Sequence, residues 1–167
     1  METIDSFKVD HLRLKPGLYI SRKDYVDDLV YITTFDIRMK KPYADEVMST
    51  GSIHAIQHLG ETFVRNDELW GDRVIYFGPN GSRTGFYLIV SGNVTTDLVL
   101  PLVQRTFDYI AEFEGEIPGS TPKECGNCAD MDLEDAKRDA ALYFNVLVDA
   151  KKDNFNYPKP RKTKGKD

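Results

Sequence analysis

Two segments rich in β-branched and aromatic residues lie on either side of a short turn, and this pair constrains the fold most. The segments are DRVIYFG at 72–78 and FYLIVSG at 86–92, and PNGSRTG connects them. Proline, asparagine and glycine break regular structure and favour a reversal of the chain. Because the connection is short, the sequence predicts two antiparallel strands that are neighbours in one sheet.

Further strands and helices follow from the same kind of pattern. LVYITTFDIRM at 29–39 predicts another strand, and the N-terminal stretch 7–24 predicts one or two more. Apolar residues recur near helical spacing in three segments: 53–66, 95–115 and 132–152. Ser52 is the expected N-cap of the first helix, and Asp132 that of the third. We therefore expect an α+β fold in which a mostly antiparallel sheet packs against helices.

The length and composition fit one globular domain. We expect residues 1–157 of the 167 to form this domain and the basic residues 158–167 to be a disordered tail. Hydrophobic residues make up 41% of the chain and charged residues 29%, as is usual in globular proteins. No apolar run approaches the roughly 20 residues of a membrane span, and the N-terminus lacks the basic-then-apolar order of a signal peptide. These features predict a cytoplasmic protein with no membrane partner.

The charge of the chain bears on its partners. A net charge of −5 argues against broad nucleic-acid binding. The charge is uneven, because residues 151–167 contain seven Lys or Arg and two Asp. A basic tail of this kind could contact RNA, but a solvated tail without a function is the favoured interpretation. We therefore expect no nucleic-acid partner.

His54 and His58 lie four residues apart in the first predicted helix, GSIHAIQHLGETF. Residues at this spacing share one face of a helix, about 5–6 Å apart at Cβ, so two imidazoles could bind one metal ion. Gln57 lies beside them, where a hydrolytic metal helix usually carries Glu. The spacing alone leaves open the alternative that both are ordinary helix residues with satisfied hydrogen bonds.

The two cysteines, Cys125 and Cys128, form a C-x-x-C pair in ECGNC. A structural disulfide is unexpected in the cytoplasm, which favours metal ligation or redox chemistry. A thioredoxin-type pair would follow a strand and open a helix, whereas this pair follows a Gly/Pro loop. Two histidines and one cysteine with an open fourth position form a known catalytic arrangement, which suits Zn, Fe(II) or Co(II).

Five segments in order along the chain carry a more specific signal. They are DSFKVDH at 5–11, TTFDIRM at 33–39, IHAIQHL at 53–59, GPNGSRTGFYL at 78–88 and EGEIPGSTPKECGN at 114–127. Together they resemble the motifs of the S-ribosylhomocysteine lyases, the LuxS autoinducer-2 synthases, over about residues 4–157. The resemblance implies a LuxS-like two-layer α+β fold and a homodimer.

The resemblance also implies a metal centre and a reaction. It assigns one divalent metal per subunit, Fe(II) in the native state with Zn or Co as alternatives, to His54, His58 and Cys125. Cys128 has no role in the family. Members cleave the thioether of S-ribosylhomocysteine and release homocysteine and 4,5-dihydroxy-2,3-pentanedione, the precursor of autoinducer-2. The metal acts as a Lewis acid, and β-elimination expels the thiolate.

The implied substrate contacts are Ser6, His11 and Arg38. An arginine suits a carboxylate because its planar fork can bind both oxygens. Without the resemblance, the simpler interpretation would be a turn serine, a hydrogen-bonded histidine and a solvated arginine at a strand end.

Two departures from the family pattern fall on its proton-transfer groups. Gln57 replaces the acid–base Glu of H-x-x-E-H, and Ser82 replaces the acid–base Cys of G-P-M-G-C. An amide does not titrate usefully, and a hydroxyl needs a base to activate it. Each lost group is worth roughly 10²–10⁴ in rate, so we expect impaired turnover.

Three explanations for the two replacements remain open. The chain could be a member that keeps the fold and the metal but not the reaction, a sequence altered to trap a ligand, or an enzyme that uses other groups such as His11 or Asp36. Two functional alternatives also remain. One is a non-catalytic protein that binds S-ribosylhomocysteine, and the other is an interaction protein with a structural metal site that includes Cys128.

Overall fold

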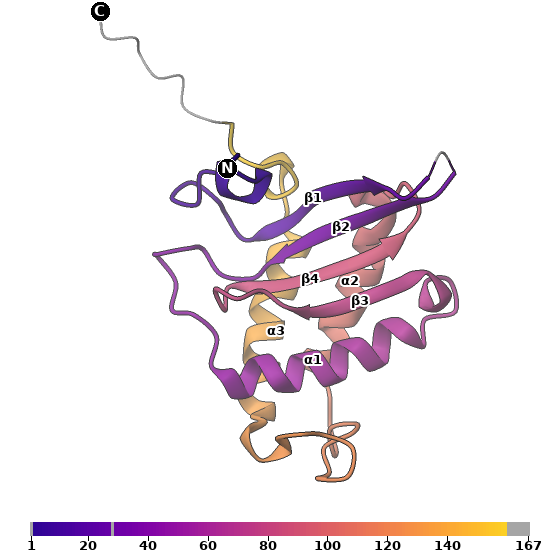
Figure 1. The fold of residues 1–167 in the computed structure, drawn as a ribbon. Coiled ribbons are helices and arrows are strands. Elements are labelled where there is room, and N and C mark those ends of the chain that lie inside the picture. The colour runs from indigo at the N-terminus through magenta and orange to yellow at the C-terminus, as the bar shows by residue number, and fades with distance from the viewer. Residues whose placement is uncertain (1, 28, 160–167) are drawn as a thin grey trace, which may run out of the picture.

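The computed structural model describes residues 2–27 and 29–159, which form a four-stranded sheet and three long helices (Figure 1). The strands lie in the order β1, β2, β4, β3, with bounds Gly17–Tyr25, Tyr31–Arg38, Gly85–Ser91 and Val74–Pro79. Each neighbouring pair is antiparallel. The long helices are α1 (Thr50–Arg65), α2 (Thr96–Ala111) and α3 (Leu133–Val148). The expected α+β fold is therefore confirmed.

Short 3₁₀ helices connect these elements: η1 (Asp5–Lys8), η2 (Gly71–Arg73), η3 (Cys128–Asp130) and η4 (Lys152–Asn154). Of the one or two strands expected at 7–24, one forms, and it begins only at Gly17. The predicted hairpin is confirmed, because Asn80 donates from its backbone N–H to the carbonyl of Gly85, 2.9 Å away, between β3 and β4. Arg83 in this turn has φ +58°, the left-handed conformation that tight turns often require.

Helix α1 begins three residues before its expected start, so the prediction that Ser52 is its N-cap was wrong. Ser49 is the N-cap, and its hydroxyl oxygen accepts from the backbone N–H of Ser52 at 3.0 Å. The Ser52 hydroxyl is buried and donates to the carboxylate of Asp139 on α3, 2.6 Å away. Asp132 caps α3 as predicted, accepting from the backbone N–H of Asp135.

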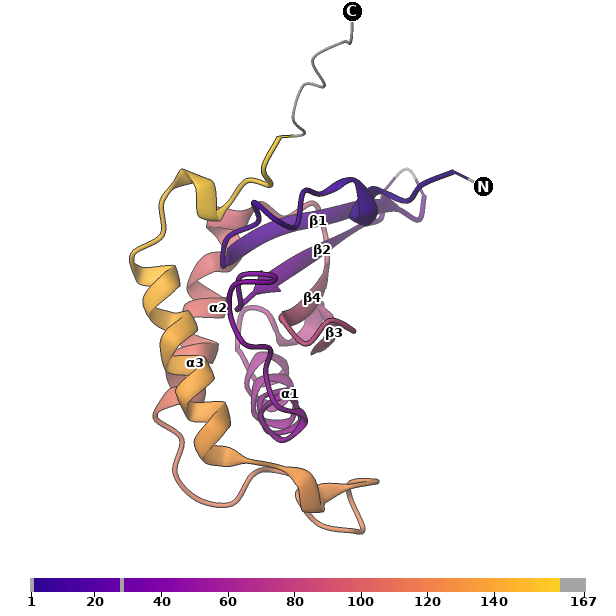
Figure 2. The ribbon, with the colours of Figure 1, turned by 90° about the vertical axis from the view of Figure 1, so that its left-hand side faces the viewer.

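One face of the sheet and the three helices enclose the core (Figure 2). Alternate strand residues point into it, including Phe35, Ile37, Phe86, Leu88 and Val90, none more than 1% exposed. A Cβ atom added to Gly60 would lie 2.4 Å from the ring of Phe77, so α1 lies directly on β3. This close packing holds fixed the helix that carries His54 and His58.

The other face of the sheet carries a row of polar and aromatic residues. Tyr19, Asp36 and Tyr87 lie side by side on β1, β2 and β4. The C-terminal segment covers part of this face, where the ring of Tyr157 stacks on Tyr19 at 4.7 Å and its hydroxyl donates to Asp36 at 2.9 Å. The end of the folded chain therefore packs on the sheet.

The domain boundary at 157 and the disordered tail stay predictions. The tail 158–167 falls largely on residues 160–167, which lie outside the described part of the chain. Of the remaining two, Lys159 accepts a hydrogen bond from Arg13 through its carbonyl oxygen at 2.8 Å. Within the described ranges, no helix has the length and apolar character needed to cross a membrane.

Candidate functional site

Helix α1 and the loop between α2 and α3 bring His54, His58 and Cys125 together. One ligand atom from each residue lies within 4.8 Å of the other two. The two imidazole rings are 4.9 Å apart at their centroids, and Cys125 Sγ lies 3.3 Å from Nε2 of His54. The helical spacing places the histidines on one face, and the fold supplies the cysteine from more than 60 residues away. In Figure 1 this loop runs beneath α1.

Hydrogen bonds orient both imidazoles. Nδ1 of His54 lies 2.6 Å from Oδ1 of Asp130, and Nδ1 of His58 lies 2.8 Å from the carbonyl oxygen of Pro118. Carboxylate and carbonyl oxygens only accept, so each Nδ1 carries the hydrogen, and in the neutral rings Nε2 is the nitrogen with a lone pair for a ligand. Histidines that ligate metals in proteins are usually held in this way.

Two glycines let the loop approach α1. A Cβ atom on Gly51 would lie 2.4 Å from the carbonyl oxygen of Asp130. Gly119 has φ +71°, and a Cβ atom there would lie 3.2 Å from Nδ1 of His58. The loop could not take this course with larger residues at these positions unless the backbone moved.

The donor set fits a borderline divalent ion. Two imidazole nitrogens and one thiolate suit Zn, Fe(II) or Co(II) and leave a fourth position for a substrate atom. The backbone N–H of Asn127 donates to Cys125 Sγ at 3.4 Å. Cys128 begins η3 and is not part of the three-residue group. The structure therefore does not support the arrangement with four protein ligands.

The three predicted substrate contacts share one cavity with Ser82. Ser6, His11, Arg38 and Ser82 line a space of about 580 Å³, together with Tyr87. Ser6 lies in η1, and Nδ1 of His11 is hydrogen bonded to the carbonyl oxygen of Val9 at 2.9 Å. This bond leaves Nε2 of His11 as an acceptor.

Arg38 is buried rather than solvated, so the simpler interpretation of this residue was wrong. Its side chain is 6% exposed and donates through Nη2 to Asp36 at 2.8 Å and through Nη1 to Oγ1 of Thr84 at 2.5 Å. Two polar atoms of this pair, Nε of Arg38 and Oδ1 of Asp36, have no partner in the described part of the chain. A buried donor without an acceptor costs free energy, so this ion pair is held at a cost in stability.

Ser82 is hydrogen bonded to neutral groups. Its hydroxyl lies 2.9 Å from Oδ1 of Asn80 and 2.8 Å from Oγ1 of Thr84. Thr84 accepts from Arg38, which leaves the Thr84 hydrogen free for Ser82, and Ser82 donates to Asn80. No carboxylate or imidazole of the described residues bonds to Ser82, so no base activates its hydroxyl directly in this arrangement.

The tyrosines around Asp36 remain protonated at neutral pH. Burial and the nearby Asp36 carboxylate raise the pKa of Tyr87 and hold the pKa of Tyr157 far above its usual range. Tyr87 is therefore a neutral hydrogen-bonding group in the wall of the cavity.

Gln57 lies on α1 next to His58 and is half-buried. It does not line the cavity of Ser82, and neither do His54, His58 or Cys125. The predicted residues thus form two groups: a candidate metal-ligating group from α1 and the α2–α3 loop, and a cavity group from the N-terminal segment, β2 and the β3–β4 turn.

Sequence patterns did not reveal two of these contacts. Asp130 is hydrogen bonded to the candidate ligand His54, and Thr84 is hydrogen bonded to both Arg38 and Ser82. Neither Asp130 nor Thr84 lies at a sequence spacing that would have predicted its contact. The Asp130 contact joins residues 76 positions apart, and only the fold brings them together.

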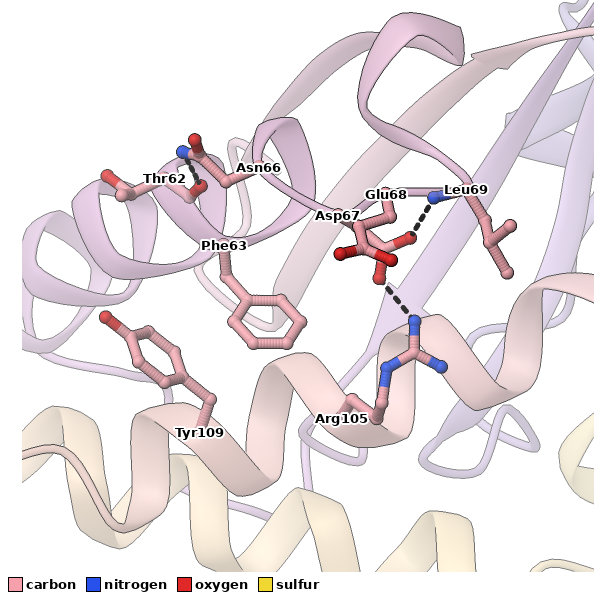
Figure 3. Close-up of a pocket in the computed structure, with 8 residues that line it drawn as sticks. All are labelled: Thr62, Phe63, Asn66, Asp67, Glu68, Leu69, Arg105 and Tyr109. Carbon is pink, nitrogen blue, oxygen red and sulfur yellow. Dashed lines mark hydrogen bonds and ion pairs between the residues drawn. The ribbon is translucent and has the colours of Figure 1, made fainter.

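A second cavity lies at the C-terminal end of α1. About 540 Å³ in volume, it is flanked by Phe63 and Tyr109, whose rings are 4.9 Å apart, and by an ion pair of Asp67 with Arg105 (Figure 3). None of the predicted site residues lines it.

Comparison with known proteins agrees with the five-segment resemblance. The sequence model of the S-ribosylhomocysteinase (LuxS) family matches residues 4–154. The S-ribosylhomocysteine lyase of Porphyromonas gingivalis is 47% identical over 159 residues, which cover 95% of this chain and 99% of the relative. Proteins of the same name from Finegoldia magna and Clostridium acetobutylicum are 49% and 47% identical over 158 residues, with the same coverage. The chain therefore belongs to the LuxS family, whose members are carbon–sulfur lyases.

Proposed function

We propose that this protein binds a divalent metal through His54, His58 and Cys125 and acts on S-ribosylhomocysteine at a reduced rate. The products would be homocysteine and 4,5-dihydroxy-2,3-pentanedione. The observation that carries the proposal is the convergence of the three candidate ligands, with Nδ1 of each imidazole hydrogen bonded to an oxygen outside the group. The two ring contacts support a site organised for metal before the ion arrives.

The metal we propose is Fe(II), with Zn or Co as alternatives, one ion per subunit. When bound, such an ion polarises a carbonyl oxygen and stabilises the negative charge that develops there. The chain itself must hold the substrate and move its protons.

We propose that the residues that line the cavity bind the substrate. Arg38 lines the cavity, and the positive charge of its guanidinium suits the carboxylate of the homocysteine half. His11 offers Nε2 as an acceptor, and Ser6 offers a hydroxyl, both suited to hydroxyl or ammonium groups of the substrate. The roles of these three residues are part of the proposal.

Proton transfer is the weak step. Gln57 cannot exchange a proton at neutral pH, and the Ser82 hydroxyl bonds to an amide oxygen and a threonine hydroxyl. Both replacements keep much of the shape of the family residues, so binding can survive where turnover is slow.

Substrate binding can be tested apart from turnover. Removing the acceptor in His11→Ala should weaken the affinity for S-ribosylhomocysteine by roughly 5–10-fold, the value of about 1 kcal/mol for one hydrogen bond. Leu12→Ala is a matched control, because Leu12 is 72% exposed and does not line the cavity. Titration calorimetry of both metal-loaded variants measures the difference, and equal affinities would remove His11 from the site.

The second candidate function is non-catalytic binding of S-ribosylhomocysteine. The neutral hydrogen-bond partners of Ser82 favour it. Metal-loaded protein would then give saturable heat with substrate and release no free thiol. Thiol titration in the same samples separates this reading from slow turnover. A structural metal site in an interaction protein is the weaker alternative, and it predicts neither heat nor thiol.

We also propose a homodimer formed through the open face of the sheet. Phe7 and Tyr76 are 75% and 42% exposed there, and Ile89 and Tyr87 line a space of about 600 Å³ beside them. An antiparallel sheet with helices on one face leaves the other for water or a partner, and exposed aromatic groups favour a partner.

Sedimentation equilibrium tests the dimer. The native chain should sediment at twice its own mass, and Tyr76→Lys should shift it towards the monomer because a buried lysine lacks a counter-charge. Leu142→Lys is the control, since Leu142 is 57% exposed on α3, away from the sheet. A native monomer, or equal shifts in both variants, would contradict this interface.

We also propose a cytoplasmic location and no nucleic-acid partner.

A further inference from the structure

We infer that Asp130 is a positioning residue for the metal centre, which sets the orientation and donor strength of His54. This inference rests on the proposed metal site and goes beyond its three ligands. The carboxylate of Asp130 accepts from Nδ1 of His54 at 2.6 Å, a short distance that is typical of a charge-assisted hydrogen bond.

The two imidazoles of the site have unequal partners. His58 donates to a neutral backbone carbonyl at 2.8 Å, whereas His54 donates to a carboxylate. A negatively charged acceptor draws the Nδ1 hydrogen more strongly and makes Nε2 a better electron donor. His54 is therefore the stronger of the two nitrogen ligands, and Asp130 is the cause.

The position of Asp130 is built into the backbone. It is the last residue of η3, and two residues later Asp132 donates from its backbone N–H to the carbonyl of Gly51 on α1 at 3.1 Å. The missing side chain at Gly51 gives the carbonyl of Asp130 its room beside the helix. The backbone thus ties the loop to α1 without the carboxylate, whose hydrogen bond within the described ranges goes to His54.

Charge balance points the same way. A divalent ion bound by one thiolate and two neutral imidazoles keeps a net charge of +1. The Asp130 carboxylate contributes one negative charge through its contact with His54, so the net charge of the ion, its ligands and Asp130 is zero. Its side chain is 37% exposed, and that of His54 is 21% exposed. A partly buried carboxylate in contact with a ligand stabilises the loaded site more than the empty one.

The experiment measures zinc affinity by competition with a chromophoric chelator. Asp130→Ala should weaken binding by about 10–100-fold, the usual effect of losing such an outer partner. Asp130→Asn keeps an acceptor oxygen but loses the charge, so it should fall between Asp130→Ala and the native protein. Glu124→Gln is the control, because it removes a negative charge next to Cys125 from a side chain that bonds Thr121 and not an imidazole. The zinc affinity of Glu124→Gln should stay within about threefold of that of the native protein.

A second readout separates positioning from general damage to the loop. The chain has three histidines, so ¹⁵N-histidine spectra of the zinc form resolve each ring. In Asp130→Ala the Nδ1 signal of His54 should shift while that of His58, which bonds Pro118, stays in place. Equal shifts in both rings, or an affinity within threefold of the native protein, would overturn the inference. If the native protein binds zinc no better than Cys125→Ala does, the proposed metal site itself fails.

Discussion

Thiol release from S-ribosylhomocysteine should rise by at least about 10²-fold when Gln57→Glu and Ser82→Cys are combined in one chain. The change restores a carboxyl group with a reference pKa near 4.3 and a thiol near 8.5. Both groups exchange protons at neutral pH far more readily than an amide or a hydroxyl does. The three candidate metal ligands are unchanged, and Ser82→Cys replaces one lining residue of the cavity by a side chain of similar shape, so the gain should report mainly proton transfer.

The structure gives a reason to expect that both replacements are needed. The Ser82 hydroxyl bonds Asn80 and Thr84, and a thiol at this position would keep neutral neighbours and ionise only in part. Gln57 lies on α1 with the two candidate metal-ligating histidines and does not line the cavity of Ser82. Because the two positions can act as one relay, each single replacement should recover little, and their effects should not add.

Anaerobic assays of the native protein, both single variants and the double variant measure this. Adding His58→Ala to the double variant should abolish the gain, since the proposed metal site is then broken. A native protein that already turns over as fast as the double variant would contradict the expected impairment. A double variant that binds substrate yet stays inactive would place the defect among the substrate contacts.

Metal removal is expected to produce the largest change in stability. At a free metal concentration about 1,000 times its dissociation constant, binding stabilises the folded state by about 4 kcal/mol. In a domain of this length that corresponds to a rise in Tm of roughly 8–16 °C. Chelation should reverse the rise.

The two cysteines form a matched pair for this measurement. Zinc affinities of about 10–16 kcal/mol over four ligands imply roughly 3 kcal/mol per ligand, or about 10²-fold in dissociation constant. Cys125→Ala should therefore lose most of the metal-dependent rise in Tm, whereas Cys128→Ala should keep it, because Cys128 lies outside the ligand group. Scanning calorimetry with and without metal measures both. Equal losses in the two variants would favour four protein ligands.

Local patterns predicted the elements of this fold well. The hairpin at 79–85 was predictable because Pro, Asn and Gly determine a turn locally. The cap of α1 was not, because Ser49 and Ser52 both suit a cap, and contact with Asp139 on α3 decides between them. Tertiary contacts therefore set the helix boundary.

The candidate site was predictable only in part. Helical spacing predicts that the two histidines lie together. Cys125 was assigned to the same site from the family resemblance, because the number of residues between it and His58 does not predict their distance in space. The burial of Arg38 was missed for a related reason. A strand-end arginine looks solvated until the fold places Asp36 and Thr84 against it.

The stacked pair of Tyr157 and Tyr19 connects the segment after α3 to the wall of the proposed substrate cavity. Tyr157 donates to Asp36, which holds Arg38, which donates in turn to Thr84 beside Ser82. Order at the C-terminal segment and order in the cavity wall are therefore thermodynamically linked, and such linkage is reciprocal. We therefore expect a ligand that fixes Arg38 to hold Tyr157 on the sheet, and Tyr157→Ala to loosen the guanidinium although Tyr157 itself does not line the cavity.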